Sequence, residues 1–241
     1  MTSILPAVTM YVGESQYIKG RLDMIKKKKT FFVGVSFSAV FIVWTLLVRF
    51  VDVQAIGPRG SSVGLATLNG YLHNLIGVHM SLYTITDWLG LVPIGVVFGF
   101  GIFGLAQWLK RKRLRKVDYD ILVLGGFYIV VMAVYILFEM VVVNYRPILI
   151  NGYLEASYPS STTMLVACVM PTAILQFRAR IKNKLCRRCV TLIISLFTTF
   201  MIIGRLISGV HWTTDIIGGI FISAGLVLTY YSVSNLEMQL R

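Results

Sequence analysis

The sequence has few charged residues, and acidic side chains are especially scarce. Only 14% of the 241 residues are charged, with 10 acidic against 23 basic side chains. A soluble domain carries about 25% charged residues, whereas 56% of this chain is hydrophobic. The hydrophobic content excludes a disordered chain, and a soluble nucleic-acid binder would explain the net charge of +13 but not the apolar excess. The composition therefore predicts a polytopic membrane protein whose length suits one compact domain.

Cysteine is also scarce. The three cysteines, Cys168, Cys186 and Cys189, are an odd number, which argues against a disulfide framework. Cys186 and Cys189 form a CxxC pair within a basic stretch, but a zinc site needs about four ligands and no second pair exists in the sequence. We therefore expect free thiols on a reducing face, and no metal or other cofactor.

Long apolar runs dominate the rest of the sequence. Each is close to the roughly 20 residues that a membrane-spanning helix needs. The stretch from Ile56 to His79, in contrast, mixes apolar and polar residues and is typical of a helix lying at a membrane surface. We expect an all-α bundle of six transmembrane helices, with one interfacial helix between the first and second spans. The predicted spans are residues 30–51, 82–109, 119–145, 160–177, 189–207 and 212–233.

The basic residues are distributed unevenly around these spans. All but four of the 23 lie before the first span, after the second, after the fourth or at the C-terminus. Since positive residues stay on the cytoplasmic side, both termini are predicted to be cytoplasmic, in a plasma membrane whose anionic lipids these segments could contact. The predicted organisation is an N-terminal tail at 1–29, a membrane domain at 30–233 and a C-terminal tail at 234–241. The exceptions are Arg49, Arg59, Arg146 and Arg205.

The outer ends of the spans carry a small set of ionisable residues: Arg146, Arg205, His211 and Asp215. Ionisable groups at membrane depth are functional candidates. His211 and Asp215 are four residues apart and would share a helix face, where a carboxylate can fix the imidazole tautomer and activate the other nitrogen. Two arginines suit a phosphate, which accepts paired guanidinium hydrogen bonds. The alternative is that these residues form interfacial salt bridges.

This set resembles the type 2 phosphatidic acid phosphatase superfamily of membrane lipid phosphatases, over residues 52–232. The third motif of that family, S-R-x5-H-x3-D, is matched here from Gly204 to Asp215, with glycine in place of serine. The first motif, K-x6-R-P, is matched at Arg146 and its following proline, but Glu139 stands at the lysine position. The second motif, P-S-G-H, reads here as Pro159, Ser160, Ser161 and Thr162.

The resemblance implies a mechanism without a metal. His211 would attack phosphorus to form a phosphohistidine, and Asp215 would orient it. Arg146 and Arg205 would hold the phosphate oxygens, with Ser160 as a further donor. Ser161, Thr162 and Glu139 would complete the substrate-binding positions.

The second-motif histidine, which protonates the leaving oxygen in this family, is absent here. Thr162 cannot act as an acid near neutral pH, and losing a positioned acid costs on the order of 10²- to 10⁴-fold. A phosphate leaving group, whose last pKa is about 6, needs the proton less than an alkoxide does. We therefore expect a preference for lipid diphosphates, such as a polyprenyl diphosphate, over lipid monophosphates.

Three roles are open for Glu139. It could be a desolvated carboxylic acid that supplies the missing proton, it could pair with Arg146, or it could mark a chain that has lost hydrolysis. His73 and His79 are alternative acids or simply interfacial residues. Asp87, next to a tryptophan, is expected to be an interfacial anchor, with a catalytic role as the alternative.

The sequence thus favours a phosphohydrolase that acts on membrane lipid phosphates or diphosphates and not on nucleic acid. Two alternatives remain. One is a transferase that passes the head group or phosphate to an acceptor other than water. The other is a catalytically degenerate protein that only binds lipid phosphate.

Overall fold

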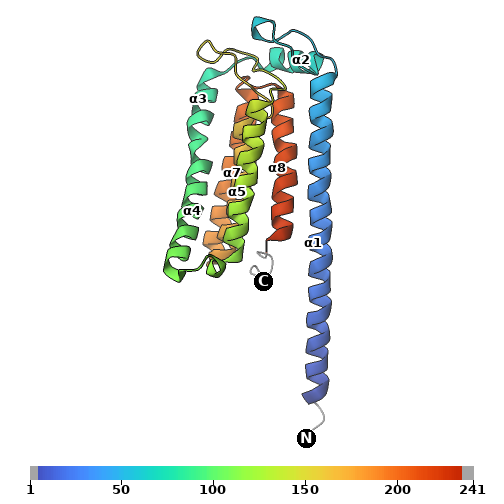
Figure 1. The fold of residues 1–241 in the computed structure, drawn as a ribbon, viewed down its shortest axis with the longest axis vertical. Coiled ribbons are helices and arrows are strands. Elements are labelled where there is room, and N and C mark those ends of the chain that lie inside the picture. Colours follow the sequence, from blue (N-terminus) through green and yellow to red (C-terminus); the bar gives the residue numbers. More distant parts are fainter. Residues whose placement is uncertain (1–4, 235–241) are drawn as a thin grey trace.

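The computed structural model describes residues 5–234, with side chains at residue 18 and from residue 20 onward. The fold is all-α, and within the described residues the extended segments form only isolated bridges. Figure 1 shows the long helices running side by side. The helices are α1 (Leu5–Phe50), α2 (Ala66–Ile76), α3 (Met80–Leu89), α4 (Leu91–Arg111), α5 (Tyr119–Met140), α6 (Ser161–Arg180), α7 (Lys184–Ile207) and α8 (Thr213–Val233), with short 3-10 turns at Pro58–Gly60 and Leu114–Lys116.

The six predicted spans are confirmed. Six helical segments among the described residues are long and apolar enough to cross a membrane. The second combines α3 and α4, which meet at Gly90. The first begins well before the expected residue 30, because α1 is one helix of 46 residues that includes most of the expected tail at 1–29. Figure 1 shows this part of α1 extending beyond the other helices.

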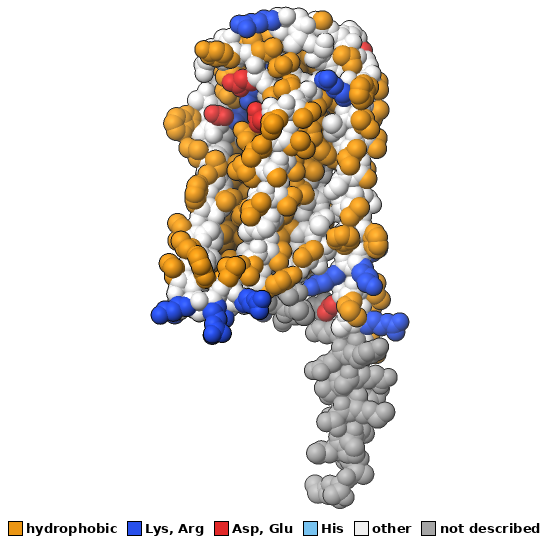
Figure 2. Space-filling model, viewed as in Figure 1, with side chains coloured by type: hydrophobic (Ala, Val, Ile, Leu, Met, Phe, Trp, Pro, Cys, Tyr) orange, Lys and Arg blue, Asp and Glu red, His pale blue; other side chains and the backbone are white. Residues whose placement is uncertain are grey.

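The two ends of the bundle differ in charge and covering. Three basic segments, at residues 26–29, 110–116 and 178–188, lie at one end of the bundle. The N-terminal part of α1 and the last turn of α8 point to the same end, which we call the basic end. Figure 2 shows lysines and arginines gathered there, below a largely hydrophobic middle. The opposite end, which we call the α2 end, is crossed by the short helix α2 (Figure 1), as the predicted interfacial helix would be.

Helix α6 is the most enclosed of the six spans. Half of its most apolar window is buried, compared with 6% for the span formed by α3 and α4. Two hydrophobic clusters meet on it, one around Tyr158 and Met164 and the other around Val166 and Met201. Because α6 starts at the α2 end, its first turn lies in the middle of that end of the bundle, among the other helix termini.

Candidate active site

His211 lies in the tight turn between α7 and α8, at the α2 end. Gly209 has φ +68°, a conformation that favours glycine. A Cβ at Gly209 would also lie 1.9 Å from the carbonyl oxygen of Gly77, so the turn packs closely against the segment before α3. The backbone N–H of His79 donates to the carbonyl of Ser208 (2.9 Å) and holds the two segments together. The turn therefore presents His211 from a fixed backbone.

The structure defines the tautomer of His211. The side chain is buried, and its Nδ1 lies 3.2 Å from the carbonyl oxygen of Ser157. A carbonyl only accepts hydrogen bonds, so Nδ1 carries the proton and Nε2 keeps its lone pair. Burial lowers the pKa of His211 to about 4, and Asp215 opposes that shift only in part. The imidazole is therefore neutral near pH 7, and its Nε2 has no protein partner.

Asp215 lies beside His211, but the two do not share a helix face as the four-residue spacing predicted, because α8 begins only at Thr213; the main contact of Asp215 is with the backbone. Its Oδ2 accepts the backbone N–H of Trp212 at 2.9 Å and so caps α8. The same oxygen is 3.8 Å from Nδ1 of His211, which is too long for a hydrogen bond. The closer partner of the imidazole is the Ser157 carbonyl, a contact that no motif indicated.

Arg205 is buried in the last turn of α7, with 1% of its side chain exposed. Its Nη2 donates to Oδ1 of Asp87 at 2.7 Å and to Oγ1 of Thr162 at 2.8 Å. Its Nε and Nη1 have no partner. Two contacts thus anchor Nη2 of the guanidinium, while Nε and Nη1 remain available to donate to an anion. Asp87 therefore forms an ion pair with Arg205, while its own side chain is 58% exposed.

Arg146 lies in the loop after α5 and does not pair with Glu139. Its Nε is 3.1 Å from Oε2 of Glu155, yet neither Nε nor Nη1 makes a hydrogen bond. Of the three roles left open for Glu139, the pair with Arg146 is not formed: the helix ends at Met140, and the chain then bends back so that the Glu155 backbone accepts the Arg146 N–H. Glu139 itself is exposed and lines a small cavity beside Ser157.

Tyr83 of α3 brings the two arginines together. The guanidinium carbons of Arg205 and Arg146 lie 4.9 Å and 5.9 Å from the centre of its ring. An aromatic face attracts cations, so the ring supports both arginines without using their N–H groups. Sequence reasoning missed Tyr83 because it belongs to an apolar span and to none of the motifs.

The second-motif residues form the start of α6. Ser160 is fully buried and caps the helix, accepting the N–H of Thr163 at 3.5 Å, while its own N–H donates to the Asp215 carbonyl. Its predicted contact with phosphate therefore stays a prediction. Thr162 faces Arg205. A helix N-terminus favours anions, so the first turn of α6 adds to the positive potential of the arginines.

The other two histidines make structural contacts. The ring of His73 packs on Trp212 with 5.3 Å between centres, and the His79 imidazole contacts the carbonyl of Ile76 at 3.0 Å. These contacts agree with the interfacial interpretation. Among residues 5–234 no three His, Cys, Asp or Glu side chains are grouped as a metal site, and Cys186 and Cys189 are free and exposed.

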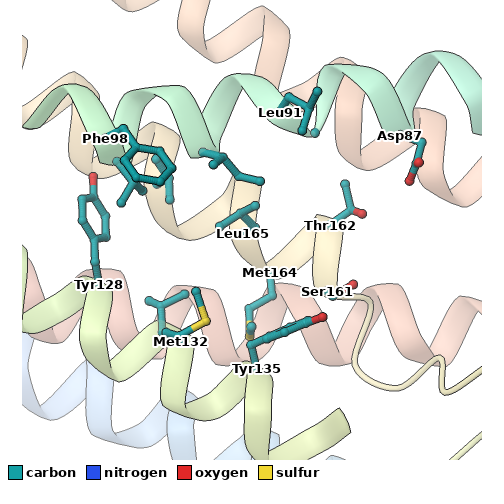
Figure 3. Close-up of a pocket in the computed structure, with 15 residues that line it drawn as sticks. Asp87, Leu91, Phe98, Tyr128, Met132, Tyr135, Ser161, Thr162, Met164 and Leu165 are labelled. Carbon is teal, nitrogen blue, oxygen red and sulfur yellow. The ribbon is translucent and has the colours of Figure 1, made fainter. Parts of the chain in front are cut away.

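An apolar groove leads to the site from the side of the bundle. It has a volume of about 600 Å³ and lies between α4, α5 and α6. Figure 3 shows Asp87, Ser161 and Thr162 at one end of the groove, with Phe98 and Tyr128 at the other. The groove therefore combines a polar end, next to Arg205, with hydrophobic walls.

The chain is similar to known proteins in two comparisons. No curated protein matched the sequence. Among solved structures, the chain is similar to the crystal structure of the first transmembrane PAP2-type phosphatidylglycerolphosphate phosphatase from Bacillus subtilis, at 22% identity and a TM-score of 0.45, over 83% of this chain and 93% of that one. Residues 141–239, which contain Arg146, the start of α6 and His211, match the PAP2 superfamily. The similarity to the PAP2 superfamily thus covers the C-terminal part of the chain.

Proposed function

We propose that this protein is a phosphohydrolase of membrane lipid phosphates or diphosphates that acts through a phosphohistidine on His211. One observation carries the proposal: Nε and Nη1 of both Arg146 and Arg205, together with Nε2 of His211, are buried without a hydrogen-bond partner, although Arg146 also forms an ion pair with Glu155. Burying unpaired donors costs free energy, so such a cluster is typical of a site completed by a ligand. Guanidinium donors near a nucleophilic nitrogen suit a phosphoryl group.

The reaction would proceed in two steps. In the first, Nε2 of His211 forms a bond to phosphorus, the bond from phosphorus to the leaving oxygen breaks, and the arginines stabilise the charge on the remaining oxygens. In the second, water attacks phosphorus and releases phosphate and neutral His211. Nδ1 of His211 keeps its proton throughout. The Ser157 carbonyl and Asp215 lie next to Nδ1 and stabilise the imidazole as its charge changes.

The groove supports a lipid as the substrate. A phosphate at Arg205 would leave the hydrocarbon part of the molecule against the hydrophobic walls between α4 and α5. By the positive-inside rule, the basic end is cytoplasmic, so the site lies at the outer face of the plasma membrane and both termini lie inside.

The test measures phosphate release from phosphatidic acid and from a polyprenyl diphosphate by wild type, His211→Ala and His211→Asn. Both variants should lose at least about 10³-fold in rate, as expected for loss of a nucleophile. Equal rates for the wild type and both variants on each lipid would reject the proposal. Phosphate transfer to an acceptor alcohol instead of water would indicate a transferase, and binding without turnover by wild type would indicate a degenerate binder.

A further inference from the structure

The site lacks the residue that would protonate the leaving oxygen. Thr162 stands at the position of the family's histidine, and a hydroxyl cannot supply the proton near neutral pH. We propose that Asp87 of α3, which lies outside all three motifs, is the proton-transfer residue in place of that histidine. This inference rests on the proposed function, since it assigns a role within the same reaction.

Asp87 and Thr162 both accept a hydrogen bond from the same nitrogen of Arg205. Oδ1 of Asp87 and Oγ1 of Thr162 lie 2.7 Å and 2.8 Å from Nη2 of Arg205. The carboxylate is therefore adjacent to the side chain that replaces the histidine. Of the other candidate acids, His73 packs on Trp212, and Glu139 lines a separate small cavity with Ser157 and Ser161 and makes no contact with Arg205.

A second departure from the motif explains how α3 comes so close. Position 204, where the family has serine, is a buried glycine in α7. A Cβ at Gly204 would lie 2.8 Å from Cγ2 of Thr86, the buried residue next to Asp87, so any larger residue would push α3 away from α7. The glycine at 204, the threonine at 162 and the carboxylate at 87 thus form one consistent set of changes.

Asp87 is also accessible to a substrate. Its side chain is 58% exposed, and it lines the polar end of the groove together with Ser161 and Thr162 (Figure 3). A lipid with its hydrocarbon in the groove and its phosphate at Nε or Nη1 of Arg205 would place the bridging oxygen near this carboxyl group.

The proton balance is complete within the site and solvent. In the free site Asp87 is a carboxylate paired with Arg205, and Arg146 and the Tyr83 ring are the other charged or titratable neighbours of that guanidinium. Before the first step the Asp87 carboxyl group takes its proton from solvent. When Nε2 of His211 bonds to phosphorus and the phosphorus–oxygen bond breaks, the proton moves from Asp87 to the lipid oxygen. In the second step the carboxylate accepts a proton from the attacking water.

The test compares substrates whose leaving groups differ in their need for a proton. Asp87→Asn keeps an oxygen that can accept from Arg205 but has no proton to transfer. It should lose on the order of 10²- to 10⁴-fold on phosphatidic acid, whose leaving group is an alkoxide, and less than about 10-fold on p-nitrophenyl phosphate, whose leaving group needs no acid. Asp87→Glu keeps a carboxyl group and should retain activity on both substrates.

Restoring the missing histidine provides the complementary result. In the Asp87→Asn background, Thr162→His should recover at least about 10-fold on phosphatidic acid, because a second acid is then in place.

Equal losses of Asp87→Asn on both substrates, or no loss on either, would overturn the proposal. Since His211→Ala must be inactive on both substrates if the proposed function is correct, failure of that function is distinguished from failure of the role of Asp87. If Asp87→Asn does not fold, Asp87→Ser, which also has no acidic proton to transfer near neutral pH, replaces it in the same comparison, and equal losses on both substrates would again overturn the proposal.

Discussion

Each end of the bundle contains an arginine paired with a carboxylate, and the two pairs are built differently. At the basic end, Arg180 donates through Nη2 to Asp120 at 2.6 Å, and through Nη1 to the side chain and carbonyl of Gln176. Gln176 in turn donates to Tyr230 at 2.7 Å. At the α2 end, Arg205 pairs with Asp87 but leaves two nitrogens without a partner.

The exposure of the two acids is reversed as well. Asp120 is 3% exposed and depends on Arg180, whose guanidinium also lies over the ring of Phe103. Asp87 is 58% exposed, and it is the arginine that is buried. A polar cluster whose donors are all used holds helices together, whereas one that buries unused donors is ready for a ligand. An arginine–carboxylate pair therefore says little about the role of the arginine until its donors are followed to their partners.

The largest effects should separate these two arginines. Arg180→Ala leaves a buried carboxylate without its partner and should destabilise the fold by about 3–5 kcal/mol. Arg205→Ala removes a buried cation with unpaired donors, so it should cost little stability, while the rate falls by about 10²- to 10³-fold because phosphate loses its donors. Thermal denaturation in detergent and phosphate release per folded molecule measure the two effects.

The matched control for this pair is lysine at each position. Arg205→Lys keeps the charge but loses the planar guanidinium with its several donors, so activity should stay low. Arg180→Lys, in contrast, should recover part of the stability. The comparison would be wrong if Arg180→Ala lost activity per folded molecule as strongly as Arg205→Ala does.

The sequence was sufficient for the features that depend on local pattern. Six apolar runs predicted the spans, and four-residue spacing placed Asp215 beside His211. The residues that it missed join segments far apart in the chain: Asp87 is 118 positions from Arg205, and the Ser157 carbonyl meets His211 across 54 positions. Apolar periodicity shows which face of a helix is buried, but not which residue of another helix that face meets.

The absence of an ion pair between Glu139 and Arg146 has a related cause. The apolar run continues to Tyr145, and the third span was therefore expected to continue as a helix to that residue. The helix ends at Met140, and Arg146 belongs to a loop in which Tyr145 pairs with Ala156. A hydrophobic run does not show where a helix gives way to a hydrophobic loop, so the spacing between Glu139 and Arg146 had no helical meaning.

A smaller effect should separate the two ends by pH. The three histidines all lie at the α2 end, and burial lowers the pKa of His211 to about 4 from 6.5. Between these values the unfolded chain binds a proton that the folded chain does not, so this contribution to stability is complete above about pH 6.5 and decreases as pH falls towards 4. The pH dependence of the denaturation temperature should therefore be weaker in His211→Asn than in wild type.

Other titratable groups contribute equally to the pH dependence of wild type and of His211→Asn, so subtracting one from the other leaves the contribution of His211. His73, whose pKa burial also lowers, is present in both. Arg180→Lys, at the basic end, should keep the full pH dependence of wild type. An unchanged pH slope in His211→Asn would mean that the imidazole is not held neutral by burial.

The smallest effect should come from carboxylates of similar exposure at the two ends. Glu155 beside Arg146 is 42% exposed, and Asp118 beside Arg111 at the basic end is 39% exposed. Exposed ion pairs contribute only about 0.2–1 kcal/mol, so neither Glu155→Gln nor Asp118→Asn should change stability much. Glu155→Gln also removes a negative charge from the phosphate site, and KM for a lipid phosphate should fall by up to about 5-fold at low salt.

That decrease in KM should vanish at high salt, because exposed charges are screened over about 3 Å at 1 M ionic strength. Asp118→Asn should leave KM unchanged at any salt concentration, since its pair lies at the opposite end from the phosphate. An increase in KM for Glu155→Gln would instead mean that Glu155 is needed to orient Arg146. The sign of this small change therefore distinguishes a carboxylate that competes with phosphate from one that positions its donor.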